Sequence, residues 1–201
     1  MTDFIPLMDL ILTLTNAGCM PVAESWCMAM ANISKPNRGK EFEYVIKKSF
    51  EKVPNISIDR LPDQMSGYSG SSNICDFILY HNPIQLYIEC KATYGNTLSI
   101  HSNNPKRVYG DISNTQWEGL LEKEKIYGVA AGYIIWYIDN DMTYFVHAHI
   151  AKQFKDDGKK SINIKDLVNN VNSIKLEGIK KRIFYDYDMK IFLQDIENTI
   201  L

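Results

Sequence analysis

Three charged residues in the middle of the chain have the types and spacing of a metal site for phosphodiester hydrolysis. They are Asp76, Glu89 and Lys91. If residues 84–92 form a strand, Glu89 and Lys91 point to one face and Cys90 to the other, because side chains alternate along a strand. Asp76 belongs to the preceding strand-like run, and a hairpin would place it beside them. Charges inside an otherwise apolar sheet indicate that they meet a cation there.

The expected cation is Mg²⁺, with Mn²⁺ as a substitute. Two carboxylates at close range have raised pKa values unless a positive charge lies between them. Mg²⁺ prefers oxygen ligands, is held by one or two carboxylates and keeps several waters, one of which serves as the nucleophile. Asp76 and Glu89 are the expected metal ligands, and the peptide carbonyl of Cys90 is a third. Lys91 would orient the water and offset charge that develops in the transition state.

Two other interpretations of these residues stay open at this point. The bare spacing is common, so Glu89 and Lys91 could lie on an exposed edge strand with Asp76 unrelated to them. The neighbouring Cys75 and Cys90 could instead be catalytic thiols, although Cys90 points away from the charged face. The four cysteines lack the CxxC spacing of a metal site and the density of a disulfide framework, which predicts reduced packing residues.

The remaining pattern predicts an α/β domain with a mixed sheet covered by helices. Asn37 is a plausible N-cap, and Cys75 and Phe77 are expected on the face opposite Asp76. The polar segment 93–113 is expected to be a loop. Helical periodicity predicts one or two short helices in 4–33, helices over 39–52, 114–127 and 164–171, a helical turn over 150–154 and a final helix after 187. Strand-type patterns predict strands over 56–60 and 182–187 and hairpins over 74–92 and 129–149.

Two histidines form a second, weaker candidate site. His147 and His149 would share one face of a strand and could bind a metal ion, since imidazole is a common zinc ligand. No third ligand has suitable spacing in the sequence. The site is therefore not favoured.

The charge is divided unevenly along the 201 residues. The formal net charge is −2, yet residues 152–182 are distinctly basic, either as a solvated face or as a surface for DNA phosphates. Phosphate contacts position a substrate without reading its bases. The candidate phosphate-binding residues are Arg38, Lys40, Arg60, Lys106, Arg107, Lys159 and Lys160, with Lys181 and Arg182 as an extension.

The order of these motifs resembles the PD-(D/E)xK nuclease superfamily and, within it, the RecU-type Holliday junction resolvases. The resemblance covers roughly residues 38–192. It rests on six separate matches in order: RGKEFEYVI, IDRLPD, ICDF with YIECKAT, NTQWEGL, DGKKSINIKDL and RIFYDYDMKIF. It implies a restriction-endonuclease-like mixed sheet flanked by helices. It also implies a Mg²⁺-dependent endonuclease that resolves junctions by paired symmetric nicks.

The resemblance adds two residues to the catalytic set. It maps an acidic residue of the opening helix onto Glu43, with Glu41 as the alternative, and a glutamine near the active site onto Gln116. Without the resemblance, Glu43 would be read as a surface partner of Lys47. A junction has approximate two-fold symmetry, so a homodimer acting on branched DNA is expected.

Two departures from the RecU pattern keep rival functions open. The long insertion that forms a stalk in that group is replaced here by MSGYSGSSN, and residues 1–34 have no recognised counterpart. The chain is therefore divided into a helical extension, 1–34, and a nuclease domain, 35–201. One rival is a restriction-type or defence nuclease that cuts duplex DNA; the other is a non-catalytic DNA-binding module.

The N-terminal region and the apolar runs bear on location. No run reaches the roughly 18 residues of a spanning helix, and no Lys or Arg precedes Lys35, unlike a signal peptide. We expect no membrane association and a cytoplasmic location, which would be that of a bacterial host if the protein is encoded by a phage.

Overall fold

The structure is a computed structural model that describes residues 37–62, 73–100, 112–170 and 173–200. The chain divides into two units, 1–36 and 37–201. The predicted helices within 4–33 and the extension 1–34 lie outside the described residues and stay predictions.

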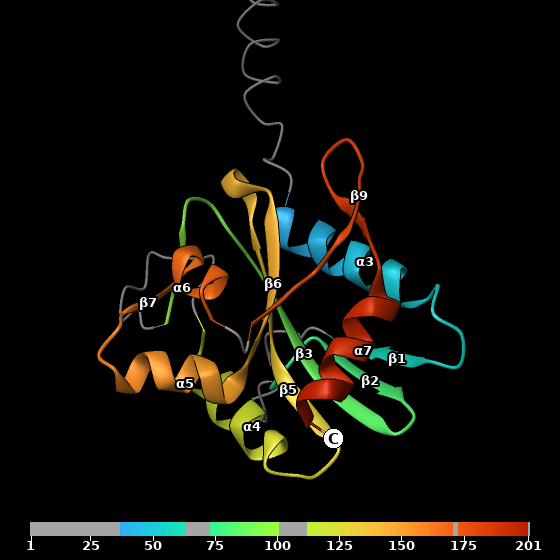
Figure 1. Ribbon diagram of the computed structural model, residues 1–201, viewed down its shortest axis with the longest axis horizontal. Coiled ribbons are helices and arrows are strands. Elements are labelled where there is room, and N and C mark those ends of the chain that lie inside the picture. Colours follow the sequence, from blue (N-terminus) through green and yellow to red (C-terminus); the bar gives the residue numbers. More distant parts are fainter. Residues whose placement is uncertain (1–36, 63–72, 101–111, 171–172, 201) are drawn as a thin grey trace, which may run out of the picture. The chain divides into compact units, whose positions relative to one another are not determined.

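A six-stranded mixed sheet forms the centre of the second unit (Figure 1), which confirms the predicted fold class. Its strand order is β1–β2–β3–β5–β6–β8. The strands β1, β2 and β3 are antiparallel neighbours, β3 and β5 are parallel, and β5, β6 and β8 are again antiparallel. The strands are β1 (Ser57–Arg60), β2 (Phe77–His81), β3 (Ile84–Thr93), β5 (Val129–Tyr137), β6 (Met142–His147) and β8 (Ser173–Lys175).

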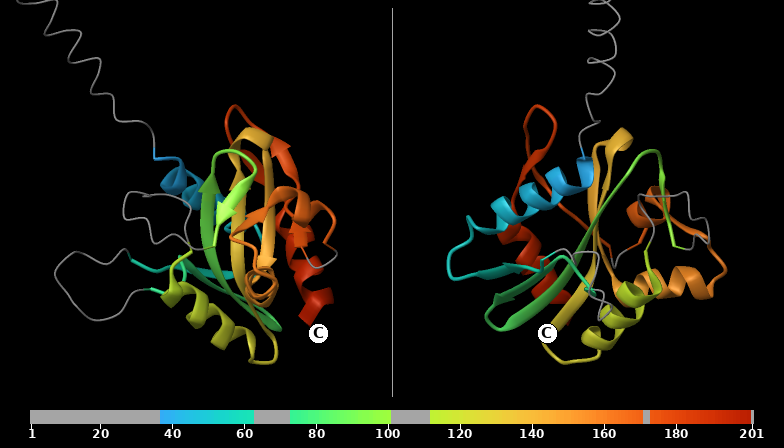
Figure 2. Two further views of the ribbon diagram at one scale, coloured as in Figure 1. Left: turned by 90° about the vertical axis from the view of Figure 1, so that its left-hand side faces the viewer. Right: turned by 180° about the vertical axis from the view of Figure 1, so that it is seen from behind.

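Helices cover both faces of the sheet. The helices α3 and α7 pack on one face and α4, α5 and α6 on the other, and the two views of Figure 2 show the sheet between these layers. The parallel pair β3–β5 needs a crossover connection, and α4 lies within it. The helices are α3 (Arg38–Phe50), α4 (Asn114–Glu124), α5 (Ala148–Asp156), α6 (Ile164–Val168) and α7 (Met189–Ile200), with a 3₁₀ turn, η1, at Ile138–Asn140.

The first of these helices begins where the sequence predicts. The side chain of Asn37 accepts a hydrogen bond from the backbone N–H of Lys40 at 3.3 Å, which satisfies one of the unpaired N–H groups at a helix start. Phe42, Ile46 and Phe50 then recur at helical spacing and are fully buried against the sheet. This packing fixes the face of α3 that carries Glu43.

Short strands account for most differences from the predicted elements. The segment expected to be a loop, 93–113, contains β4 (Thr97–Ser99), which pairs with β7 (Ser161–Asn163). The strands β8 and β9 (Gly178–Lys180) were also not predicted, whereas β10 (Tyr185–Tyr187), the partner of β9, lies in the predicted run. Three residues are too few to display alternation, so pairing with a distant strand decides their conformation.

The end of the second predicted hairpin is also different. The strand β6 ends at His147, and His149 lies in the first turn of α5, so the two histidines do not share a strand face as expected. The helix α5 runs for nine residues instead of one turn, because Ile150, Ala151 and Phe154 are buried together with the core. Among the described helices, none is long and apolar enough to cross a membrane.

Candidate active site

Asp76 stands immediately before β2, where the chain bends. Its backbone N–H donates to the carbonyl of Ile88 at 3.0 Å, and its carbonyl accepts from Leu61 at 2.8 Å, so the backbone is held between two strands. The bend interrupts strand alternation. Cys75 and Phe77 therefore enter different core layers, and the prediction that they share a face was wrong. The side chain of Asp76 turns to β3, where Oδ2 accepts the backbone N–H of Cys90 at 2.8 Å.

Glu89 is the buried carboxylate of the site, with 4% of its surface exposed. It lies in the middle of β3, directly opposite Tyr133 of β5, a strand whose residues are all buried. Its Oε1 accepts from Nε2 of Gln116 at 2.5 Å and lies 2.7 Å from Nζ of Lys91. The carboxylate is thus held by one amide and one ammonium.

Lys91 and Gln116 complete a closed polar network around Glu89. Nζ of Lys91 donates to Oε1 of Gln116 at 3.3 Å, while the amide nitrogen of Gln116 donates to Glu89. Oε1 of Gln116 also accepts the backbone N–H of Ser113, whose Oγ accepts the N–H of Gln116. This capping box fixes the start of α4 and the rotamer of Gln116 together. The glutamine suggested by the resemblance therefore lies beside Glu89 and Lys91.

Glu43 reaches the site from α3, but its carboxylate is paired with the guanidinium of Arg60. Its Oε2 accepts from Nη2 of Arg60 at 2.8 Å and from Nε at 3.3 Å. Its charge nevertheless raises the pKa of both Asp76 and Glu89. No group of three donor atoms that lie within 4.8 Å of one another forms around these carboxylates, among the residues that the structure describes. Glu43 is therefore placed at the border of the site, and its alternative, Glu41, pairs with Arg38.

Burial and like charge raise the pKa values of the two central carboxyls. Desolvation is the largest cause for Asp76, followed by the charge of Glu89, and together they raise its pKa to about 8. Burial also raises the pKa of Glu89, against the opposing effect of the Lys91 ammonium. When both carboxyls are ionised, Lys91 neutralises only one of them. This arrangement is stable only if a proton or a cation joins the pair.

These groups fit a divalent cation with a preference for oxygen. Asp76 and Glu89 would hold Mg²⁺, or Mn²⁺ in its place, because hard cations take carboxylate ligands and retain water. The backbone of Cys90 is bound to Asp76 through its N–H, and the role of its carbonyl as a ligand stays a prediction. With a divalent ion present, the excess negative charge becomes an excess of positive charge, which suits an anionic phosphodiester.

The two neighbouring cysteines are unsuited to nucleophilic catalysis. Burial is the main cause that raises the pKa of the Cys75 thiol to about 12, and burial with the adjacent carboxylates raises that of Cys90 well above its usual value. Because the thiolate is the nucleophile, both groups remain unreactive thiols near neutral pH. This removes the alternative of a catalytic cysteine.

The predicted phosphate-binding residues have different surroundings. Among those near α3, Arg38 pairs with Glu41 at 2.8 Å, Arg60 pairs with Glu43, and Lys40 is exposed. Arg60 thus has a local role beside the site. Lys106 and Arg107 lie outside the described residues.

The basic residues after α5 lie on two different parts of the fold. Nζ of Lys159 lies 2.9 Å from Asp166 and over the ring of Phe154, while Lys160 is exposed. Lys181 and Arg182 are exposed between β9 and β10. A role of these residues in phosphate binding stays a prediction.

Two features of the site were not apparent from the sequence. Tyr133 faces Glu89 across the β3–β5 pair, and its buried hydroxyl has no hydrogen-bond partner among the described residues. Arg60 binds Glu43 across 17 positions of sequence. Both arise from the register and packing of separate elements, and only the register of β3 against β5 would have indicated Tyr133.

Gly119 allows α4 to approach the segment before Asp76. A Cβ at this position would lie 2.3 Å from Cγ2 and 2.8 Å from Cβ of Ile74, too close for any real contact. We expect Gly119→Ala to lower the free energy of unfolding by about 1–2 kcal/mol, although alanine favours helix by about 1 kcal/mol. Urea unfolding measures this effect. Glu118→Ala, at an exposed neighbouring position, should be neutral or stabilising, and equal stabilisation of both variants would contradict the close packing.

Comparisons with known proteins give a limited result. No protein-family model matches the sequence, and no curated protein matches it. Among solved structures, the chain is similar to the 1.6 Å structure of Hjc, a Holliday junction resolvase from the archaeal hyperthermophile Archaeoglobus fulgidus. The two share 16% identity over 54% of this chain and 74% of that chain, with a TM-score of 0.34. Since this likeness is weak, a functional assignment has to rest on the residues of the site.

Proposed function

We propose that this chain is a Mg²⁺-dependent DNA endonuclease of the PD-(D/E)xK type that resolves four-way junctions by paired nicks. The observation that carries the proposal is the half-buried Asp76 beside the buried Glu89, with Lys91 at 2.7 Å from Glu89. Charged side chains in an otherwise apolar sheet destabilise the folded state unless they are paired or bind a metal ion. The motif order from α3 to α7, which resembles the RecU-type resolvases, supports the choice of DNA as substrate.

Each residue has a role that follows from its contacts. Asp76 and Glu89 would hold the metal ion, which when bound supplies a water nucleophile and stabilises charge on the phosphate. Lys91 keeps an ammonium beside Glu89, where it can donate a hydrogen bond to a phosphate oxygen as negative charge develops there. Gln116 positions both groups through its amide. Arg60 holds Glu43 at the border of the site.

A homodimer is part of this proposal. One copy carries one Asp76–Glu89–Lys91 site, and resolution of a junction requires two opposed nicks. Two copies related by a two-fold axis would present two equivalent sites to a substrate with the same approximate symmetry. Light scattering of the full chain, alone and with a junction, would measure the number of copies. A single copy on the cleaved junction would exclude paired cutting.

The decisive experiment compares cleavage of a mobile four-way junction with cleavage of a linear duplex of the same arm sequence. The full chain is incubated with Mg²⁺ or with EDTA, and each strand is labelled in turn. We expect symmetric nicks in opposite strands of the junction with Mg²⁺ alone, and none with the Asp76→Asn chain. Cutting of the duplex would instead assign a restriction-type nuclease, which the short segment MSGYSGSSN favours. Binding without any cutting would assign a non-catalytic module.

A further inference from the structure

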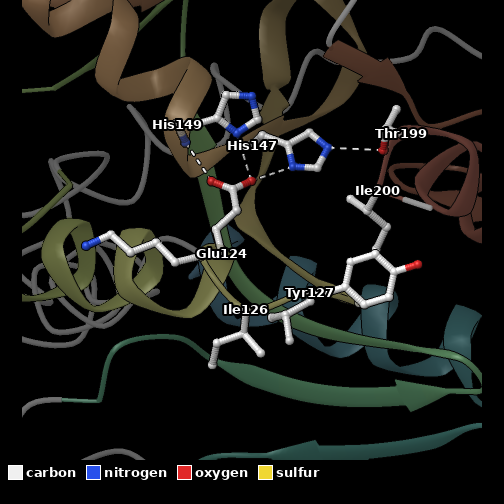
Figure 3. A pocket seen from close by; sticks show the side chains of 10 residues that line it. Glu124, Ile126, Tyr127, His147, His149, Thr199 and Ile200 are labelled. Carbon is white, nitrogen blue, oxygen red and sulfur yellow. Dashed lines mark hydrogen bonds and ion pairs between the residues drawn. The ribbon is translucent and has the colours of Figure 1, made fainter.

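A second group of potential metal ligands lies away from the Asp76 site, at the opposite end of α4. Glu124 ends α4, His147 ends β6, and His149 lies in the first turn of α5. One ligand atom from each residue lies within 4.8 Å of the other two, and this is the one such cluster within the described ranges. Figure 3 shows the carboxylate directed at both imidazoles. The third ligand that the sequence did not reveal comes from a helix 23 residues before His147.

The two imidazoles approach the same carboxylate oxygen. Oε1 of Glu124 lies 2.6 Å from Nδ1 of His147 and 3.0 Å from Nδ1 of His149. Ligand atoms around a tetrahedral zinc ion, with bonds of about 2.0–2.1 Å, are roughly 3.3 Å apart. The carboxylate oxygen therefore needs to move away from each imidazole nitrogen by only a fraction of an ångström to admit an ion.

The surrounding hydrogen bonds hold the cluster in a state suited to metal binding. Oε2 of Glu124 accepts the backbone N–H of His149 at 2.8 Å, which fixes the carboxylate. The hydroxyl of Thr199 donates to the carbonyl of Ile196 at 2.7 Å, so its lone pairs face Nε2 of His147 at 3.4 Å. Metal-binding histidines commonly donate their second ring N–H to such an acceptor.

The contact between His147 and Glu124 is a hydrogen bond that a metal ion would replace. Nδ1 of His147 lies 2.6 Å from Oε1 of Glu124, so a proton is shared between the two atoms. Binding of a metal ion to imidazole and carboxylate ligands displaces such a proton. His147 is 3% exposed, which keeps its imidazole directed at the carboxylate.

The site is closed on the protein side and open on the other. The side chain of His149 is 57% exposed, whereas that of Glu124 is 11% exposed. The cluster borders a pocket of about 430 Å³ whose rim includes Ile126, Tyr127 and Thr199 (Figure 3). Three protein ligands and an open fourth position are the arrangement of a zinc ion that retains a water molecule.

We propose that Glu124, His147 and His149 form a binding site for one Zn²⁺ ion, which fastens the end of α4 to the junction of β6 and α5. Two imidazole nitrogens and one carboxylate are donors suited to zinc and unsuited to Mg²⁺. The site is independent of the proposed nuclease function, because it shares no residue with Asp76, Glu89 and Lys91.

Direct metal binding to the tag-free full chain tests this proposal. The measurement is made with Zn²⁺ by calorimetry and with Co²⁺ by visible absorption, in excess Mg²⁺ and on an Asp76→Asn background that weakens the other site. We expect one ion per chain, a Co²⁺ spectrum without thiolate charge-transfer absorption, and a higher Tm with Zn²⁺. Absence of binding, or a thiolate spectrum that assigns the ion to cysteines, would overturn the proposal.

Three variants separate the site from other ligands. His149→Ala changes an exposed side chain and should fold, and Glu124→Gln keeps an acceptor for the N–H of His149 while it loses the charge. Each should weaken Zn²⁺ binding by at least about 100-fold, since removal of a supporting contact alone costs about 10–100-fold. His81→Ala is the matched control, because His81 pairs with Glu197 instead. Unchanged affinity in both site variants, or an equal loss in the control, would refute the site.

Discussion

Replacement of Asp76 by asparagine is expected to abolish Mg²⁺-dependent cleavage of a four-way junction while it stabilises the metal-free protein. Loss of a metal ligand removes several kcal/mol of transition-state stabilisation, and about 4 kcal/mol corresponds to a rate lower by about 1,000-fold. Asparagine retains an acceptor for the N–H of Cys90, which lies 2.8 Å from Asp76 Oδ2. Single-turnover cleavage of a labelled junction measures the rate, and anisotropy with Ca²⁺ measures binding, which should be unchanged.

The opposite effect on stability follows from the charge of the pair. Burial and the charge of Glu89 raise the pKa of Asp76 from 3.8 to about 8, so the folded state disfavours the ionised carboxyl. For an acid with a raised pKa, stability is lost as pH rises from the unfolded value to the folded one. In EDTA the wild type should therefore lose stability between about pH 4 and 8. Asp76→Asn should lose less stability, because only Glu89 then keeps a raised pKa, and above pH 8 its Tm should be higher by at least about 2–4 °C.

Asp59→Asn is the matched control for both measurements. Asp59 lies on the adjacent strand β1 with its side chain exposed, so the substitution removes the same charge without a change in the site. It should leave the cleavage rate and the metal-free Tm almost unchanged. If Asp76→Asn cut the junction at the wild-type rate, Asp76 would not be a metal ligand. If it cut slowly but were also less stable in EDTA, loss of fold would explain the result.

The core of the candidate site follows from short-range rules. Alternation along one strand puts Glu89 and Lys91 on a common face, and a two-residue turn pairs that strand with the one that follows Asp76. The same local rules predicted α3, with its cap at Asn37, and the two hairpins. These features need little information from distant parts of the chain, so a single sequence is enough to derive them.

Features that depend on distant contacts could not be derived in this way. The position of Tyr133 opposite Glu89 depends on the parallel register of β3 and β5, which a crossover of more than 30 residues sets. Glu124 meets the two histidines only because the end of α4 packs beside the start of α5, where β6 ends. The sequence spacing of the two histidines suggested a metal site, but the missing ligand came from a different element. A pattern identifies potential ligands, whereas packing decides which of them meet.

Lys91→Met is expected to lower the cleavage rate by about 100- to 1,000-fold, the effect of removing one preorganised donor at a reacting oxygen. Methionine keeps most of the volume of the buried lysine stem and removes the ammonium. Since Nζ lies 2.7 Å from Oε1 of Glu89, the variant leaves that carboxylate buried without its counter-charge. In EDTA near neutral pH, Lys91→Met should therefore be less stable than the wild type, whereas Asp76→Asn should be more stable.

This opposition of signs distinguishes a charged catalytic group from a merely structural one. Two variants that both lose cleavage but shift the metal-free Tm in opposite directions cannot owe their inactivity to unfolding alone. Lys125→Met removes an exposed lysine paired with Glu122 on α4 and serves as the control, with an expected change in stability within about 1 kcal/mol. Lys91→Arg keeps a positive charge and should recover more of the stability than of the cleavage rate, because the planar guanidinium differs in shape from a compact ammonium. Full cleavage by Lys91→Met would show that Lys91 only balances the charge of Glu89 and leaves transition-state stabilisation to other groups.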